Sequence, residues 1–504
     1  MSSEDDFMLE DDMSDIEFDD SMDEVFSDVD DFGAVIAEKD KLKPYEVEHK
    51  SLSVDDIRRV QTVRVQQVSA VLGLPDEQVA TLLRHFKWNR EKLLERYMDD
   101  PDSAVKAAGI TTEDSAPPKL EVVPGFMCDI CCNDDEGMDT YALPCQHRFC
   151  KDCYEYYLTQ KIKDEGESRK IQCPGEKCNV VMDEKTVKLI VRDDVYQRYV
   201  TLLDRTYVDD NEHIKWCPAP NCENAVECAA SLKQLQTVVP TVTCAAGHEF
   251  CFGCSLADHQ PCMCALVKRW LKKCEDDSET ANWLSANTKE CLKCQSTIEK
   301  NGGCNHMTCR KCKYEFCWVC MGPWAEHGTS WYNCNRYEEK NSINARDAQA
   351  KSRASLERYL HYYNRFANHE QSAKLDRELY NRTEKKMAQL QANSELSWIE
   401  VQFLKAAVDV LVQARQTLKW TYAFAFYLQR NNVTEIFEDN QRDLEMAVEN
   451  LSHLCEQPID PKELSTLKQN ILDKTVYVNT RKEVLLSDTA KGLKEERWTY
   501  NVEV

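Results

Sequence analysis

The sequence lacks any long hydrophobic run and any secretory leader. No stretch approaches the roughly 18 uninterrupted apolar residues that a membrane-spanning helix needs. The first residues, MSSEDDFMLE, lack the basic and apolar regions of a signal peptide. We therefore expect a chain without membrane contact, in the cytoplasm or also in the nucleus, where thiols are not expected to pair as disulfides. The 26 cysteines of such a chain indicate metal ligation or catalysis.

An excess of basic charge is also lacking. The chain carries 63 Lys and Arg against 88 Asp and Glu, a formal net charge of −25. Nucleic-acid binding needs clustered basic side chains that displace phosphate counterions. A zinc-dependent nucleic-acid reader is therefore disfavoured, and we expect no nucleic-acid partner. No basic residue precedes Lys39, and we expect residues 1–45 to form a disordered acidic tail.

Helical patterns occur on both sides of the cysteines. At roughly 150 residues per domain, 504 residues predict three or four domains, and small metal-bound modules would raise that number. Apolar residues at helical spacing predict an N-terminal bundle of three short helices within 53–110, with the second opening at Pro75 and the third ending near Pro101.

Glycine and proline become scarce beyond Asn341. Gly492 is the single glycine there, and a capping box begins at Ser397 ahead of a long apolar run with helical spacing. This texture predicts an all-helical C-terminal domain over 341–504, with about four long helices and aromatic residues in its core.

The first of three cysteine clusters defines the first module, 124–190. Zinc takes four Cys or His ligands in a tetrahedron, and Cys-x2-Cys on a tight turn presents two thiolates at once. Eight such ligands are present, which is enough for two ions. Their spacing fits interleaved pairing, with Cys128, Cys131, Cys150 and Cys153 on one ion and Cys145, His147, Cys173 and Cys178 on the other.

The second cluster, in the middle module (195–268), is one ligand short of two sites. Seven candidates have suitable spacing: Cys217, Cys222, Cys244, Cys251, Cys254, His259 and Cys264. His248 is the best candidate for the eighth, because a histidine shortly after Cys244 can turn back onto the same ion. Cys228 and Cys262 are the alternatives.

The third module, 288–335, has more candidates than two ions need. Ten side chains compete for eight places: Cys291, Cys294, Cys304, His306, Cys309, Cys312, Cys317, Cys320, His327 and Cys334. Interleaved sites like those of the first module would use Cys304 and His306. Sequential pairing would instead group Cys291, Cys294, Cys309 and Cys312, then Cys317, Cys320, His327 and Cys334.

Short loops favour the sequential arrangement, which leaves Cys304 and His306 without a metal. These two follow Gly302 and Gly303, a pair that would let another backbone approach closely. A free cysteine two residues from a histidine is a candidate nucleophile and base. The interleaved arrangement remains open at this point, and it would make the protein a zinc scaffold.

The order of the modules resembles the RING-between-RING ubiquitin ligases, specifically the Ariadne family. The segment Asn301–Met307 is similar to the catalytic loop of that family. Cys317-Trp-Val-Cys320, followed by Gly322-Pro-Trp324 and His327-Gly328, is similar to the same region of that family. The segment Trp331–Tyr337, which runs into a helical tail, is similar to the Ariadne subfamily. In the middle module, Ala245 and Ala246 depart from the usual pattern of a cysteine soon after Cys244, so the fourth ligand there is in doubt.

The resemblance implies a multidomain α+β fold: a ubiquitin-associated-like bundle, a first RING, an in-between-RING module, a helical linker (269–287), a catalytic RING-like module and an Ariadne-type helical domain. It implies six zinc ions. It also implies that a conjugating enzyme loaded with ubiquitin docks at Ile130, whose alternative role is a small core residue. Ubiquitin would pass to Cys304 as a thioester and then to a substrate lysine, with His306 as base and Glu315 orienting it.

The resemblance further implies regulation. The C-terminal domain would fold over the catalytic loop, with Glu438 and Glu449 as its contacts, although both could equally lie on solvated helix faces. The N-terminal bundle would bind a ubiquitin-like modifier on a cullin-type ligase, and we expect a monomer. The competing hypothesis is an adaptor that docks conjugating enzymes without forming a thioester.

Overall fold

The computed structural model describes the chain in stretches: residues 42–111, 118–230, 238–276, 288–300, 302–327, 334–337, 348–393, 398–457 and 464–503. The predicted acidic tail before residue 42, the linker residues 277–287 and the predicted cap at Ser397 lie outside the described residues. Within these stretches, no helix combines the length and apolar character that a membrane crossing requires.

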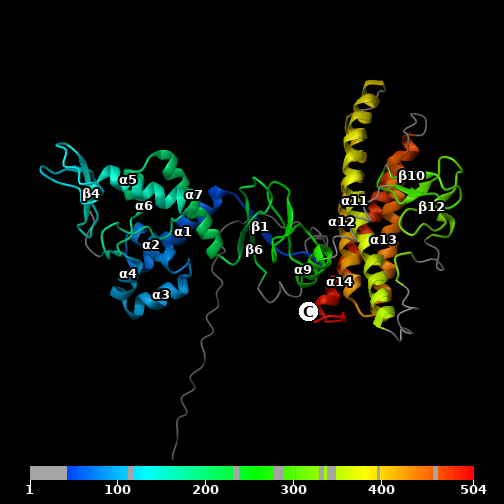
Figure 1. Ribbon diagram of the computed structural model, residues 1–504, viewed down its shortest axis with the longest axis horizontal. Helices are drawn as coiled ribbons and strands as arrows, with labels where there is room; N and C mark the ends of the chain where they lie inside the picture. Colours follow the sequence, from blue (N-terminus) through cyan, green and yellow to red (C-terminus); the bar gives the residue numbers. More distant parts are fainter. Residues whose placement is uncertain are drawn as a thin grey trace, which may run out of the picture. The chain divides into compact units, whose positions relative to one another are not determined.

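The N-terminal bundle contains four helices where three were predicted. They are α1 (Val54–Leu72), α2 (Asp76–His85), α3 (Arg90–Asp99) and α4 (Pro101–Ala108) (Figure 1). The third helix was predicted to end near Pro101 with none after it, but proline is tolerated in the first turn of a helix, where its missing N–H is not needed, and α4 begins there. Asp100 caps α4 by accepting a hydrogen bond from the Ser103 amide at 3.0 Å.

A short strand before the bundle belongs to the sheet of the middle module. β1 (His49–Leu52) pairs antiparallel with β6 (Ala225–Cys228), which also pairs with β5 (Ile214–Trp216). The register sets Ser51 opposite Val226. Residues 46–52 were in neither the predicted tail nor the predicted bundle, because a strand of four residues has too few positions to show an alternating pattern.

The first module combines a small sheet with helices. Its strands are β2 (Glu121–Val122), β3 (Asp139–Ala142) and β4 (Arg148–Cys150). Its helical segments, and the long helix that follows, are α5 (Lys151–Thr159), the π-helical turn η2 (Gln160–Asp164), α6 (Glu184–Ile190) and α7 (Asp193–Asp210). Tyr154, Leu158, Val187 and Tyr199 pack in the buried core that these helices share.

The middle and third modules are built from two-stranded hairpins. The middle module adds β7 (Thr241–Thr243), β8 (Glu249–Cys251) and the helix α9 (Cys264–Asp276). The third module contains the hairpins β9 (Thr288–Glu290) with β10 (Thr297–Glu299) and β11 (His306–Thr308) with β12 (Glu315–Cys317), then the 3-10 turn η3 (Trp324–Glu326).

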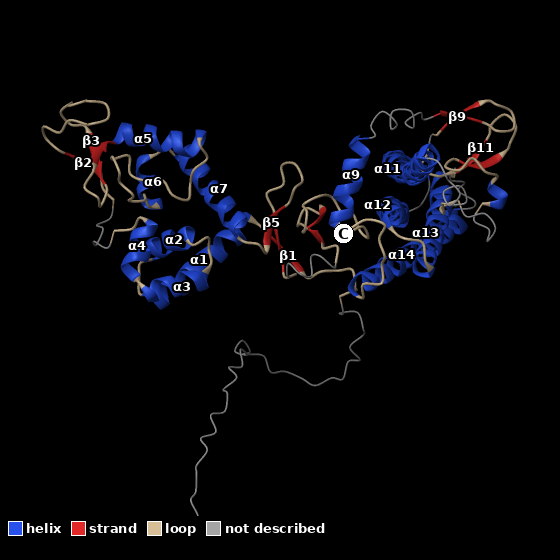
Figure 2. Cartoon of the chain, turned by 60° about the horizontal axis from the view of Figure 1, so that its bottom comes forward, coloured by secondary structure: helices blue, strands red, loops and turns tan. Residues whose placement is uncertain are grey.

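Four long helices form the described part of the C-terminal domain, as predicted. They are α11 (Ala348–Asn393), α12 (Trp398–Tyr427), α13 (Asn432–Glu456) and α14 (Leu464–Lys494), and they lie side by side in both views (Figures 1 and 2). Trp420, Tyr422, Phe424 and Phe437 are buried in its core. The chain is thus α+β with several domains, which confirms the predicted fold class.

The helix α9 leaves the middle module and packs into the core of this C-terminal domain. Trp270 on α9 is fully buried, and its ring lies 5.3 Å from Phe426 and 5.4 Å from Phe366. Burying a tryptophan in this way typically stabilises a fold by about 3–5 kcal/mol relative to alanine. The start of the predicted linker, 269–276, is therefore part of a packed core.

Candidate functional site

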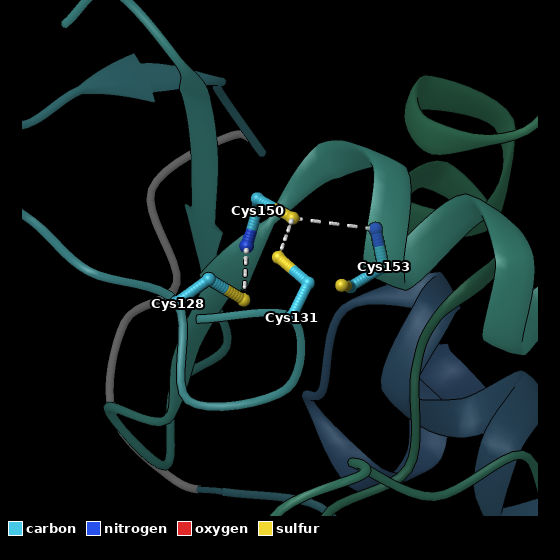
Figure 3. Close-up of side chains that lie close together, drawn as sticks. All are labelled: Cys128, Cys131, Cys150 and Cys153. Atoms are coloured by element: carbon cyan, nitrogen blue, oxygen red, sulfur yellow. Dashed lines mark hydrogen bonds between the residues drawn. The ribbon is translucent and has the colours of Figure 1, made fainter. Parts of the chain in front are cut away.

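The first module gathers its ligand candidates in the predicted interleaved order. Cys128, Cys131, Cys150 and Cys153 lie with their sulfur atoms within 4.8 Å of one another (Figure 3). The Cys150 sulfur is 3.7 Å from that of Cys131 and accepts a hydrogen bond from the Cys153 amide at 3.4 Å. β4 ends and α5 begins at this point, so the turn presents both thiols of the Cys-x2-Cys pair to one place.

The second group of the first module joins residues that are distant in sequence. Cys145, His147, Cys173 and Cys178 come together, with 3.6 Å between the sulfurs of Cys145 and Cys173. His147 Nδ1 lies 3.3 Å from the Cys145 sulfur. A Cβ on Gly175 would lie 2.7 Å from the His147 ring, so glycine is needed there for the histidine to fit.

The middle module brings His248 into the place that was in doubt. His248 Nδ1 lies 3.4 Å from the Cys244 sulfur and 3.6 Å from the Cys217 sulfur, and Cys222 completes the group. The alternatives, Cys228 and Cys262, are fully buried in apolar clusters instead.

The other group of the middle module contains Cys251, Cys254, His259 and Cys264. His259 Nε2 lies 3.2 Å from the Cys254 sulfur, while its Nδ1 lies 2.7 Å from the Cys262 carbonyl oxygen. A carbonyl on the second ring nitrogen fixes the tautomer that leaves Nε2 free to bind a metal.

The third module groups its thiols sequentially. Cys291, Cys294, Cys309 and Cys312 form one group, with sulfur distances of 3.6 Å for Cys291 to Cys312 and for Cys294 to Cys309. His327 interacts with Cys320 and Cys334, and Cys317 interacts with the same two thiols.

These distances suit zinc. Four thiolates at the usual Zn–S length of about 2.3 Å lie about 3.8 Å apart at the corners of a tetrahedron. The sulfur pairs of the modules are 3.5–3.9 Å apart, and the donors are the Cys and His side chains that zinc prefers.

Cys304 is held by the C-terminal domain. Its amide donates to Glu456 Oε1 at 3.1 Å, and its sulfur lies 3.6 Å from the Glu449 carbonyl oxygen. The side chain is 3% exposed. Burial, with the carboxylates of Glu449 and Glu456 nearby, raises the pKa of the Cys304 thiol well above its ordinary value. The thiol is therefore protonated here and inaccessible to a bulky acyl donor.

The two glycines before Cys304 permit a close approach, as predicted, but by side chains and not by another backbone. A Cβ on Gly303 would collide with the Asp376 carboxylate, and a Cβ on Gly302 would collide with Glu456. A substitution at either glycine would therefore separate this loop from α11 and α13.

A buried charge network surrounds the loop. The Asn305 amide hydrogen-bonds one Glu449 oxygen, and its side chain donates to the other at 2.8 Å. Arg415, fully buried on α12, binds Glu449 at 3.0 Å and Asp376 at 2.5 Å. Two carboxylates thus pair with one guanidinium in a place where a single charge would be costly.

Lys300 extends this network from the third module. Its Nζ donates to Asn305 Oδ1 at 3.0 Å and to Ser372 Oγ at 2.7 Å. Burial and the nearby Arg415 together lower the pKa of Lys300 to about 8.

His306 carries the polar contacts expected of a base. Its Nε2 lies 3.2 Å from Glu315 Oε2, and its own amide donates to the Cys304 sulfur at 3.4 Å. The antiparallel register of β11 and β12 produces this pair, because Thr308 is opposite Glu315 and His306 is two residues away. Burial lowers the pKa of His306, and Glu315 partly opposes that shift.

The two acidic residues expected to contact the catalytic loop behave differently. Glu449 contacts it, as described above. Glu438 instead binds Arg336 Nε at 3.2 Å, so its expected contact with the loop is wrong. Both residues are buried, which excludes the alternative of solvated helix faces.

At Ile130 the side chain is 49% exposed, which excludes a role in the core.

Comparison with known proteins agrees with this architecture along most of the chain. The family model "E3 ubiquitin-protein ligase ARIH1, UBA-like domain" matches residues 59–99, and the C3HC4-type zinc finger (RING finger) matches 128–175. The model "IBR domain, a half RING-finger domain" matches 197–264, a second IBR model matches 286–335, and the Ariadne domain matches 357–481.

Curated relatives agree over nearly the full length. E3 ubiquitin-protein ligase dbl4 of Schizosaccharomyces pombe is 58% identical over 95% of this chain and 94% of its own. The chain belongs to the Ariadne family of RING-between-RING E3 ubiquitin-protein ligases. Drosophila melanogaster ariadne-1 is 44% identical over 90% of each chain. Human ARIH1 is 43% identical, covering 90% of this chain and 82% of its own.

Membership fixes the class of reaction and the general partners. This Ariadne-family protein is a ubiquitin transferase with zinc-finger modules, and its partners include ubiquitin, a ubiquitin-conjugating enzyme and protein substrates. The predicted family and enzyme class are confirmed.

Several residues around Cys304 were not anticipated from the sequence: Lys300, Asp376, Arg415 and Glu456. For Arg415 a signal existed. Helical spacing places it on the same face as Leu411 and Leu418, which are both fully buried, so a charge on the buried face of α12 could have been noticed.

Proposed function

We propose that this ligase carries ubiquitin on Cys304 as a thioester before it reaches a substrate lysine. The observation that supports this most is the group of Cys291, Cys294, Cys309 and Cys312, which is complete without Cys304. A thiol left out of the metal groups, with the amide of His306 on its sulfur, has the surroundings of a nucleophile.

The reaction has two steps. The Cys304 thiolate attacks the carbonyl carbon of the thioester on the conjugating enzyme, and that enzyme leaves as a thiolate. A substrate amine then attacks the same carbon. A C–N bond forms, the C–S bond to Cys304 breaks, and His306 takes the proton of the amine and returns it to the departing thiolate or to solvent. A lysine with a pKa of about 10.4 needs this help at neutral pH, and a general base typically contributes about 10²–10⁴-fold.

We also propose six zinc ions, two in each cysteine-rich module. Bound zinc would supply structure to modules that have little apolar core. Two of the four-residue groups would hold the ions of the third module, and neither would include Cys304 or His306.

The covered thiol indicates an autoinhibited arrangement. Glu449, Glu456 and Asp376 surround the Cys304 loop, and the ligase would work only after the loop leaves them. A partner can drive this only by binding the opened form better. We propose a cullin-type ligase carrying a ubiquitin-like modifier, bound at the N-terminal bundle, as that partner. The conjugating enzyme would dock at the exposed Ile130, and the protein would act as a monomer in the cytoplasm or nucleus.

A trapping experiment tests the covalent step. The full chain, with and without Glu449→Ala to uncover Cys304, is mixed with ubiquitin, activating enzyme and conjugating enzyme, and analysed with and without a reducing thiol. We expect a ubiquitin adduct that thiol removes, and with Cys304→Ser an adduct that resists thiol and yields to base. Cys132→Ser, which changes an exposed thiol outside the metal groups, is the matched control and should leave the reducible adduct intact. An adduct on another residue, or none, would refute the proposal.

A further inference from the structure

A tryptophan in the third module lies flat against His306. The ring centroids of Trp324 and His306 are 4.3 Å apart and their planes differ by 8°. Trp324 is also stacked with His327, at 4.8 Å and 10°. The indole therefore contacts both the proposed base and one of the side chains proposed to hold zinc.

Glu315 alone cannot fix the orientation of His306. A single hydrogen bond leaves a ring free to rotate about the line between the two heavy atoms. Glu315 is moreover 55% exposed, against 16% for His306, and ion pairs open to water contribute little. A flat aromatic contact removes the remaining rotation, because the ring can no longer tilt without losing its stacking.

The contacts to His306 come from two different domains, and this decides which of them remain once the C-terminal domain has moved away from Cys304. His453 of α13 also lies near His306, at 5.4 Å between ring centroids, but it belongs to the C-terminal domain. Trp324 lies on η3 and His306 on β11, within the same module. The bridge between Phe316 and Pro323 joins η3 to β12, the partner strand of β11. The contact with Trp324 would therefore persist when α13 moves away.

We propose that Trp324 is a positioning residue for the second transfer step, in which the indole, itself stacked on His327, holds the His306 imidazole so that His306 accepts the proton of the attacking amine. This inference rests on the proposed thioester function. Trp324 stacks on His306 and His327, whereas Cys304 is contacted by Glu449, Glu456 and the His306 amide, so we expect thioester formation not to depend on Trp324.

The test separates loading from discharge in the full chain, with and without Glu449→Ala to uncover Cys304. Thioester formation is measured in one turnover, and the loaded protein is then mixed with free lysine. With Trp324→Leu we expect loading within about two-fold of the parent and discharge slower by about ten-fold, part of the range of a general base. Trp324→Phe, which keeps a flat ring, should restore discharge to within about three-fold, whereas a purely apolar role would be met equally by leucine.

Two further measurements exclude a folding defect. Zinc content should be unchanged in both variants; if Trp324→Leu loses zinc, Trp324→Met replaces it as the non-aromatic variant. The ring protons of His306, observed by NMR of histidine-labelled protein, should be shifted upfield in the parent and the Phe variant and lose that shift in the non-aromatic one.

The outcomes separate the two proposals. Equal discharge by the aromatic and non-aromatic variants would overturn the positioning role while leaving the thioester intact. An equal loss of loading and discharge would also overturn it, since the residue would then be structural. If neither the parent nor the Glu449→Ala chain forms a reducible adduct, the proposed function fails and this inference fails with it.

Discussion

The first and third modules contain the same string, Cys-x-His-x2-Cys-x2-Cys, and use it differently. In the first module its leading Cys and His join a metal group completed by Cys173 and Cys178. In the third module the corresponding pair, Cys304 and His306, stays outside the group formed by the two later cysteines. Equal spacing within a motif therefore does not determine which side chains share an ion.

The length of chain after the string explains the difference. Nineteen residues lie between Cys153 and Cys173, enough for α5 and a return to the far side of the module. Four residues lie between Cys312 and Cys317, and this short turn keeps the next ligands on the near side. Loop length, and not local sequence, thus separates the proposed nucleophile from the ligand candidates.

The largest expected effect comes from removing the equivalent cysteine in each module. Cys304→Ala should reduce ubiquitin transfer by about 10³-fold or more, because the nucleophile is lost, while thermal unfolding is unchanged. Cys145→Ala should lower the Tm as well, because it removes a metal ligand that the first module needs to fold. Differential scanning fluorimetry beside a transfer assay measures both. A fall in Tm with Cys304→Ala would remove the distinction between the modules.

The second largest effect concerns the cover on Cys304. Glu449→Ala removes one of the two carboxylates that bind Arg415 and the acceptor of the Asn305 side-chain amide, and breaking a buried ion pair typically costs about 3–5 kcal/mol. The closed arrangement should weaken and basal autoubiquitination should rise about ten-fold. Glu435→Ala, on the same helix but 45% exposed, is the control and should change activity less than two-fold. Equal activity of the two variants would contradict autoinhibition through this network.

The third largest effect concerns how fast Cys304 is alkylated at different pH values. Like the effect of Glu449→Ala on autoubiquitination, it depends on the cover over Cys304, and we expect it to be smaller. The pKa of Cys304 is raised in the closed form by burial and by Glu449 and Glu456, opposed by Arg415. The closed form therefore keeps a proton that the open form loses above the ordinary thiol value, so the contribution of Cys304 to closure is lost as pH rises beyond about 8.5. Lys300 acts in the opposite sense, since its lowered pKa favours closure as pH rises above about 8.

Mass-spectrometric measurement of iodoacetamide labelling checks this expectation. Between pH 7 and 8 the parent should label at Cys304 about five-fold more slowly than Glu449→Ala, which should follow an ordinary thiol. Identical labelling rates in the two chains would show that Cys304 is uncovered in solution.

The smallest effect should come from the docking surface of the first module. Ile130→Ala should weaken thioester loading about five-fold, the loss of about 1 kcal/mol that an exposed apolar contact supplies at an interface, without a change in Tm. Val122→Ala, 52% exposed in the same module, is the control. A loss that appears equally in both variants would argue against a specific role for Ile130.

The ligand groups were predictable because the side chains that bind one zinc ion often come in pairs only a few residues apart in the sequence. Turns such as Cys128-x2-Cys131 determine local geometry without reference to the rest of the chain. Counting the ligands of the third module, with loop length considered, predicted that Cys304 is left without a metal. His248 was the weakest of these predictions, and the structure places it beside Cys217 and Cys244.

The network around Cys304 was not predictable because its members meet only through long-range packing. Asp376 on α11 and Arg415 on α12 face each other through the pairing of two helices, and Lys300 of another module binds Asn368 on α11. The boundary between modules was unpredictable for the same reason. Since Trp270 of α9 is buried in the C-terminal domain, removing residues 341–504 would expose a large apolar surface, and Glu449→Ala is the cleaner test of autoinhibition.

Zinc counting by native mass spectrometry on Cys304→Ser tests the separation of nucleophile and ligand most directly. We predict six zinc ions in the parent and in the variant, since serine would replace a thiol that binds no metal. A variant that carries five ions would make Cys304 a ligand, and the third module would then be a second zinc scaffold like the first.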